Sequence, residues 1–152
     1  MPIKLKTSMD DIRIHLEEFT ENAKNAIVSV LTDVGLQCVK EAREGKGYTD
    51  QTGNLCSSVG FIVVRDGKIV EKTLASQIGD NKPTTQEGMN KADDYLKHLA
   101  SSHSSGICLI VVAGMNYAVY VEGRGRNVLT SSKLLAERLV PKMLTDLGFK
   151  MK

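Results

Sequence analysis

The feature that most constrains the fold is a long stripe of apolar residues near the start of the chain. Its members recur at intervals of three and four, which is the spacing of one face of an α-helix. Ser8 or Asp10 can cap the beginning, and acidic residues crowd the first turns, where the helix dipole favours them. The sequence therefore predicts one helix over about 10–44. The stripe consists of Ile12, Leu16, Phe19, Ala23, Ala26, Val30, Val34 and Cys38.

Such a helix is too long for the domain that carries it. At 1.5 Å per residue it would span about 50 Å, whereas a compact domain of 152 residues has a radius of gyration of about 15 Å. We therefore expect the helix to project beyond its own domain. Its apolar stripe then needs a cover, and two alternatives stay open: a break at Gly35 that folds the helix back, or a neighbouring subunit.

A β-hairpin is predicted over about 55–74. Asp66 and Gly67 form a strong two-residue turn signal between the apolar segment 59–65 and the segment 68–74. A second helix is expected over about 84–100, because the spacing of Thr84 and Glu87 is that of a capping box.

The segment Ile107–Ala113 is an unbroken apolar run rich in β-branched residues, and it predicts a central core strand over about 107–114 with both faces covered. A last helix is expected over about 131–147, with caps at 130–132 and with Pro141 kinking or restarting it. The few strands do not alternate regularly with helices. The fold class is therefore α+β, in a single domain over 1–152: a small, mostly antiparallel sheet flanked by helices.

The composition excludes several classes of protein. With 41% apolar and 25% charged residues, the chain can build a core and is not expected to be disordered. No stretch reaches the roughly 18 apolar residues of a membrane helix, and residues 1–7 lack the apolar segment of a signal peptide. We therefore expect the protein to be made in the cytosol and not to associate with a membrane.

The sequence shows no pattern typical of catalysis, a metal or a cofactor. The cysteines, Cys38, Cys56 and Cys108, are widely spaced without a CxxC pair, which favours buried reduced thiols. The histidines lack metal-ligand spacing and are poor candidates for the base of a nucleophilic triad, so each is expected to be solvated. Residues 123–127 resemble a phosphate loop only weakly, because the lysine is missing; a surface loop is favoured. The chain is expected not to be an enzyme.

A segment rich in tyrosine and arginine follows the predicted core strand. Tyrosine and arginine are enriched among the anchoring residues of protein interfaces, so we expect this segment to contact a partner or another subunit. The charge distribution adds to this: eight acids face four bases over 10–44, and seven bases face three acids over 122–152. The contact candidates are Tyr117, Tyr120, Glu122, Arg124, Arg126 and Asn127.

Two short motifs resemble the minor structural proteins of tailed bacteriophages that are described as tail-completion, neck or head-tail connector proteins. The first is the turn Thr52, Gly53, Asn54, Leu55, followed by Ser57 or Ser58 at the entry to a strand. The second is the segment Asn116, Tyr117, Ala118, Tyr120, Val121, Glu122, which is similar to the family's Tyr-Ala-x-Tyr-Val-Glu. Both occur in the family's order, and the predicted elements from about 10 to 148 follow the family as well.

The resemblance implies a non-enzymatic virion protein that assembles into a homo-oligomeric ring at the head-tail junction, in the cytoplasm of a bacterial host. Its partners would be other neck, connector and tail proteins, and DNA would pass through the ring without sequence-specific binding. Acidic residues of the first helix, if they line the channel, would repel phosphate and keep DNA from sticking.

The alternative interpretation is a small nucleic-acid-binding protein. Its basic C-terminal patch would contact phosphates, with an affinity that falls steeply with salt. The patch would consist of Arg124, Arg126, Lys133, Arg138 and Lys142.

Overall fold

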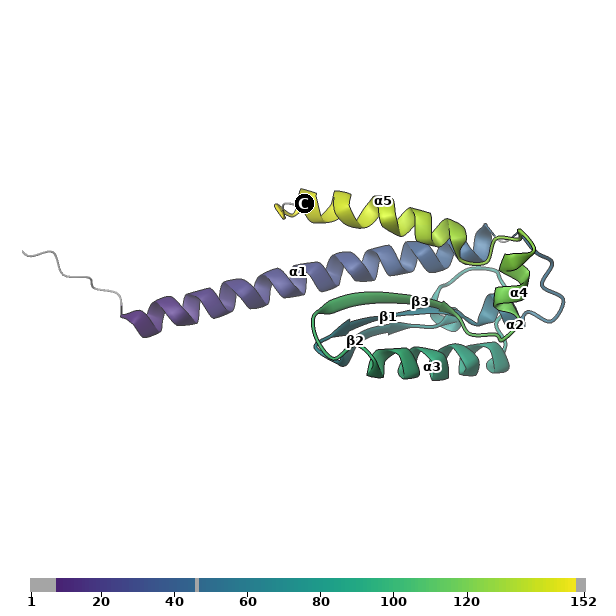
Figure 1. The fold of residues 1–152 in the computed structure, drawn as a ribbon, viewed down its shortest axis with the longest axis horizontal. Helices are drawn as coiled ribbons and strands as arrows, with labels where there is room; N and C mark the ends of the chain where they lie inside the picture. The colour runs from purple at the N-terminus through teal and green to yellow at the C-terminus, as the bar shows by residue number, and fades with distance from the viewer. Residues whose placement is uncertain (1–7, 46, 150–152) are drawn as a thin grey trace, which may run out of the picture.

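The computed structural model describes residues 8–45 and 47–149 of the 152-residue chain. The prediction that residues 1–7 lack a signal-peptide segment therefore concerns residues outside the described ones. The chain forms an α+β fold, as predicted, with a three-stranded antiparallel sheet between helices (Figure 1). In chain order the elements are α1 (Met9–Glu44), α2 (Asn54–Ser57), β1 (Val59–Arg65), β2 (Lys68–Thr73), η1 (Ala75–Gln77), α3 (Gln86–Ser101), β3 (Ile107–Ala113), α4 (Ala118–Gly123) and α5 (Thr130–Asp146).

Helix α1 is one unbroken helix of 36 residues. A capping box begins it: the Ser8 hydroxyl accepts from the Asp11 N–H at 3.1 Å, and the Asp11 carboxylate accepts from the Ser8 N–H at 3.3 Å. The helix does not break at Gly35. That residue lies against Phe61 of β1, where a Cβ atom would stand 2.5 Å from the aromatic ring. Of the two covers considered for the stripe, folding back at Gly35 is therefore wrong.

Strand β1 is the centre of the sheet, whose strand order is β2-β1-β3. Its side chains alternate, with Phe61 and Val63 in the core toward α1 and Ile62 and Val64 in the core toward α3. The prediction that Ile107–Ala113 forms the central strand is wrong, because β3 lies at an edge of the sheet and pairs with β1 alone. An apolar run indicates that both faces of a strand are covered. An edge strand that lies between two layers of helices is covered on both faces as well.

Three expected boundaries need correction. The hairpin begins at Val59, because Asn54–Ser57 form the short helix α2. The N-cap of α3 is Thr85, whose hydroxyl accepts from the Gly88 N–H at 3.2 Å, so the expected pair of Thr84 and Glu87 does not cap it. Helix α5 continues through Pro141 and does not restart there, since a proline removes one hydrogen bond of a helix that other contacts hold.

The layers of the fold follow from the two faces of α1 (Figure 1). One face packs on the sheet through Leu31, Val39 and Ala42, and the other packs on α5 through Val30, Val34 and Cys38. Helix α3 covers the opposite face of the sheet through Ala92, Leu96 and Ala100.

A reciprocal pair of hydrogen bonds joins α1 to α5. The Cys38 thiol donates to the Ser132 carbonyl at 3.4 Å, and the Ser132 hydroxyl donates to the Cys38 carbonyl at 2.7 Å. Burial raises the pKa of the Cys38 thiol to about 11, so it stays protonated. All three cysteines are reduced; Cys38 and Cys56 are buried, as predicted, and Cys108 is half-buried.

Candidate functional site

The turn at Thr52–Leu55 is held by side chains around it. The Asp50 carboxylate accepts from the Gly53 N–H at 3.0 Å and from the Cys56 N–H at 2.7 Å. Gly53 has a φ of 78°, in the left-handed region, and a Cβ there would stand 2.9 Å from Pro83. The turn thus needs its glycine for two reasons, and its residues lead into α2 instead of directly into a strand.

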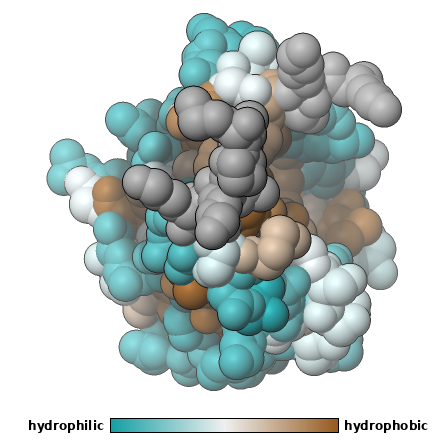
Figure 2. Space-filling view, turned by 90° about the vertical axis from the view of Figure 1, so that its left-hand side faces the viewer, coloured by the Kyte–Doolittle hydropathy of each residue, from teal (hydrophilic) through white to brown (hydrophobic). Residues whose placement is uncertain are grey.

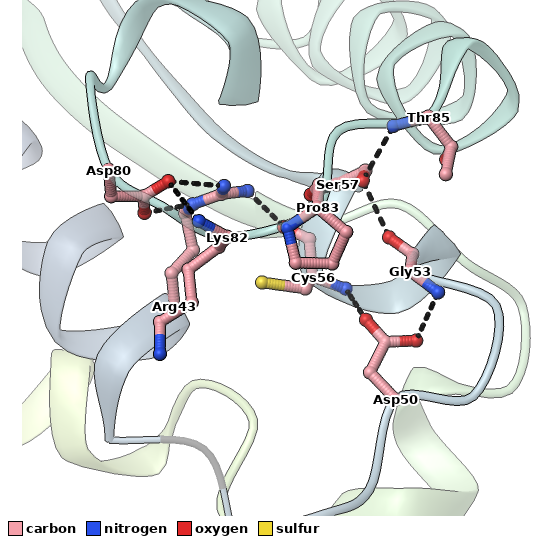
Figure 3. A network of polar contacts seen from close by, with 9 residues as sticks. All are labelled: Arg43, Asp50, Gly53, Cys56, Ser57, Asp80, Lys82, Pro83 and Thr85. Atoms are coloured by element: carbon pink, nitrogen blue, oxygen red, sulfur yellow. Dashed lines mark hydrogen bonds and ion pairs between the residues drawn. The ribbon is translucent and has the colours of Figure 1, made fainter.

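A buried arginine also holds the region of this turn in place (Figure 3). The Arg43 side chain is fully buried, and its guanidinium donates two 2.7 Å hydrogen bonds to Asp80 and one, also 2.7 Å, to the Cys56 carbonyl. The Arg43 hydrogen bonds hold the pKa of Asp80 below its ordinary value. The ion pair therefore ties the end of α1 to α2 and to the loop before α3. No pattern in the sequence pointed to this buried role.

The tyrosine-rich segment forms a short helix, α4, and not an extension of the core strand. Ala118 points inward and packs in a small core with Leu55 and Val128. Tyr120 and Val119 point outward and are 73% and 77% exposed. The alanine thus holds α4 to the domain while its neighbours remain available for contact.

Glu122 has a task inside the chain. Its carboxylate accepts from the N–H groups of Val128, Leu129 and Thr130 and from the Thr130 hydroxyl. Partial burial acts to raise the pKa of Glu122, but these hydrogen bonds outweigh it, so the pKa is lowered. The carboxylate thereby stabilises the N-terminus of α5, which has no side-chain cap from its own N-cap residue.

Asn127 also binds within the chain. Its amide nitrogen donates to the Gly45 carbonyl at 3.0 Å and to the Ser131 hydroxyl at 2.7 Å, and its amide oxygen accepts from the Ser131 N–H at 3.0 Å. Of the predicted contact residues, Glu122 and Asn127 therefore shape the surface. Tyr117, Tyr120, Arg124 and Arg126 are the ones that it presents to solvent.

The fold brings the two motifs together around one open hollow of about 670 Å³. We call it the tyrosine–arginine hollow. Neither Arg124 nor Arg126 forms an ion pair with another residue in the part of the chain that the structure describes. One side is formed by residues 48–52 with Leu55, and the other by Tyr117, Tyr120, Val121, Arg124 and Arg126.

A second hollow, of about 540 Å³, lies on the other side of α4. It is lined mainly by apolar side chains of β3, α3 and α4, including Val112, Leu99 and Val119, and Glu122 is the charged residue in its lining. We call it the apolar hollow. Helix α4 therefore forms a ridge between a hollow with two cations in its lining and one that contains none among the described residues.

The opposite end of the molecule carries a different exposed feature (Figure 1). Residues 8–22 of α1, which we call the free half, are all exposed. The free half reaches past the sheet and past the end of α5, which confirms the prediction that this helix projects beyond its own domain. Figure 2 views this end, where hydrophobic side chains lie among hydrophilic ones. The exposed fractions of Met9, Leu16 and Phe19 are 79%, 61% and 73%.

The basic residues of the alternative interpretation do not share one face. On α5, Arg138 and Lys142 follow Lys133 by five and nine residues, which places them about 140° and 180° around the helix from it. Lys133 also lies 3.8 Å from Glu137 in an ion pair. The predicted patch is therefore divided between opposite faces of α5 and the loop after α4.

No group of three metal-ligating side chains occurs in residues 8–45 and 47–149. Within the same residues, no helix is long and apolar enough to cross a bilayer. Comparisons of the chain with protein-family models, with curated proteins and with solved structures found no match.

Proposed function

We propose that this protein is a non-enzymatic structural component of a tailed-phage virion. It assembles into a ring at the head-tail junction and bridges proteins on the capsid side to proteins on the tail side around the path of the DNA. The proposal combines the resemblance of two sequence motifs with the surfaces that the fold leaves exposed.

The observation that carries the proposal is the meeting of the two motifs around the tyrosine–arginine hollow. The turn at Thr52–Leu55 and the segment around Tyr117 and Tyr120 are far apart in the chain, and each is braced from behind, by Asp50 and by Glu122. The exposed side chains around the hollow include Tyr117 and Tyr120 with Arg124 and Arg126, residue types that anchor protein contacts. Braced and solvent-facing residues of this kind support a binding surface.

The position of the hollow supports a ring. It lies at one end of the molecule and the free half of α1 lies at the other (Figure 1). Two different contact surfaces at opposite ends favour heterologous association, which gives a closed ring when the rotation between copies closes and an open filament when it does not. The part of the apolar stripe in the free half, which no other part of the described chain covers, also favours assembly.

Assembly is the measurement that tests this proposal. The purified protein, alone and mixed with the portal, head-closure and tail proteins of a phage that encodes it, is examined by analytical ultracentrifugation and native mass spectrometry. We expect assemblies larger than a dimer, and Tyr120→Ala or Arg126→Glu should reduce assembly while leaving the unfolding midpoint unchanged. Arg138→Glu, which makes the same charge change outside the hollow, is the matched control.

Two results would count against the proposal. The first is a protein that stays monomeric alone and with all of those partners. The second is DNA binding whose affinity falls steeply with salt and depends on the basic residues of α5, which would favour the nucleic-acid-binding alternative.

A further inference from the structure

The free half of α1 and the tyrosine–arginine hollow are complementary in chemistry and lie at opposite ends of one molecule (Figure 1). We propose that the free half of one copy docks in the tyrosine–arginine hollow of the next copy. This inference rests on the proposed ring and names the two surfaces that join its subunits.

The free half presents an apolar stripe on one side. Met9, Ile12, Leu16 and Phe19 follow at intervals of three, four and three residues, so they line one face of the helix. Ile14 is two residues from both Ile12 and Leu16, which places it on the opposite face. The stripe therefore gathers most of the exposed apolar side chains of the free half on one face, and Ile14 is the exception.

Carboxylates border this stripe on both sides. Asp10 and Glu17 directly follow two stripe residues, and Asp11 and Glu18 directly precede the other two, so each lies about 100° around the helix from its neighbour in the stripe. With Glu21, residues 8–22 hold five carboxylates against one arginine, Arg13. A docked free half would therefore bring negative charge to the rim of its site.

The tyrosine–arginine hollow offers the complement of that surface. Tyr117 and Tyr120 supply exposed aromatic area, and Arg124 and Arg126 supply two exposed cations. The lining carboxylate, Asp50, is already bonded to the N–H groups of Gly53 and Cys56. Exposed aromatic rings beside two cations match an apolar stripe bordered by carboxylates.

Charge also argues against two other ways of covering the free half, which are a second free half and the apolar hollow. Pairing two free halves would place net negative charge beside net negative charge, since residues 8–20 hold four carboxylates against one arginine and Glu21 is already paired with Arg65. The apolar hollow beyond α4 has Glu122 as the charged residue in its lining, so it offers the rows of carboxylates no cation. The hollow with the two arginines is therefore the site that the charges select.

Cross-linking between two differently tagged copies of the full chain tests the proposal. One copy carries Leu16→Cys and the other Tyr120→Cys, both in a Cys108→Ser background because Cys108 is the cysteine that is not fully buried. The copies are mixed under conditions where ultracentrifugation shows assembly, and a short bismaleimide is added. We expect a 16–120 product between differently tagged copies, at a yield at least about tenfold above that of the control pairs.

Two matched controls keep the result specific. Ile14→Cys places the thiol on the opposite face of the same helix, and Val119→Cys places it on the apolar-hollow side of α4, at nearly the same exposure as Tyr120. A dominant 16–16 product, or a yield of 16–119 above that of 16–120, overturns the docking. An assembly with no 16–120 product overturns the docking while leaving the ring, and an unsubstituted chain that never assembles overturns both.

A charge-reversal cycle gives an independent readout. Arg124→Glu with Arg126→Glu should weaken association roughly tenfold or more, and adding Glu17→Lys with Glu18→Lys on the same chain should restore it. Arg138→Glu with Lys142→Glu makes the same change in charge on α5 and should leave association within about twofold. Loss of association without restoration by the lysine pair would contradict contact between these residues.

Discussion

The two halves of helix α1 have the same spacing of apolar residues and opposite surroundings. In the half after residue 30, Val34, Cys38 and Val39 are fully buried between the sheet and α5. In the free half, stripe residues such as Leu16 and Phe19 remain 61% and 73% exposed. The same pattern thus marks both the core of a subunit and, under our proposal, the contact between subunits. Periodicity identifies an apolar face but does not say which molecule covers it.

The largest expected loss of stability comes from removing a contact at the C-terminal end of α1, in the half that is buried. In Asp80→Ala, the buried Arg43 would lose the partner of two of its hydrogen bonds, and an uncompensated buried charge costs about 3–5 kcal/mol of unfolding free energy. The matched change in the free half is Glu21→Ala, which removes a solvent-screened pair with Arg65 and should cost much less. Urea denaturation of both variants measures the difference, and equal losses would contradict it.

The same ion pair predicts part of the acid unfolding of the protein. The pKa of Asp80 is below its ordinary value of 3.8 in the folded chain, so the folded state binds that proton more weakly than the unfolded state. Its contribution to stability is therefore complete above about pH 5 and is lost as the pH falls below 4 through the folded pKa. Asp80→Asn should show a shallower loss of stability over that acid range, followed by denaturation at a series of pH values.

A matched pair of leucines tests the comparison directly. Leu31 is 7% exposed and Leu16 is 61% exposed on the same helix. Leu31→Ala should lower the unfolding free energy by about 2–5 kcal/mol, because it leaves a cavity in the core. Leu16→Ala should change the stability of the monomer by no more than about 0.5 kcal/mol. Its effect should appear in assembly, so a large loss of monomer stability would show that the stripe packs within its own chain.

The contact between Gly35 and Phe61 gives a smaller effect. In Gly35→Ala, the new methyl group would overlap the buried ring, and overpacking of this kind costs about 1–3 kcal/mol. Gly123→Ala is the control, because a Cβ at that glycine meets no atom within 4 Å. Thermal unfolding should show a lower midpoint for the first variant alone.

The smallest effect concerns the start of the free half. Ser8→Ala removes one bond of the capping box and should cost about 1 kcal/mol of local helix stability. Because the free half contacts little else in the chain, the loss should appear as faster amide exchange in its first turns, without a shift in the global unfolding midpoint. A shifted midpoint would mean that the two halves of α1 unfold as one unit.

The sequence predicted the elements better than their arrangement. The helix over 10–44, the turn at Asp66 and Gly67 and the α+β class are confirmed, because periodicity and turn chemistry act over a few residues. The central position of 107–113 was wrong, since an edge strand between helices is as apolar as a central one. The helical form of the tyrosine segment was missed, because α4 depends on contacts of Ala118 with residues far away in the chain.

The candidate surface was predicted in part. Tyrosine and arginine are common in contacts, and this composition pointed to Tyr117, Tyr120, Arg124 and Arg126, while the same reasoning gave Glu122 and Asn127 no internal role. Both bind backbone groups nearby in the chain, and the fit of those bonds depends on the loop conformation. The approach of the two motifs around one hollow depends on the packing of Leu55 with Ala118, residues far apart in the chain, which no local pattern announces.

The absence of a side chain at Gly35 has a consequence for the reach of the whole helix. The ring of Phe61 lies where α1 lacks a Cβ, and the positions four residues away on the same face of the helix carry Leu31 and Val39. Sliding α1 along the sheet would drive one of those branched side chains into the ring. The contact between Gly35 and Phe61 thus fixes the position of α1 along its own axis. It thereby also sets how far the N-terminal end of α1 extends from the domain.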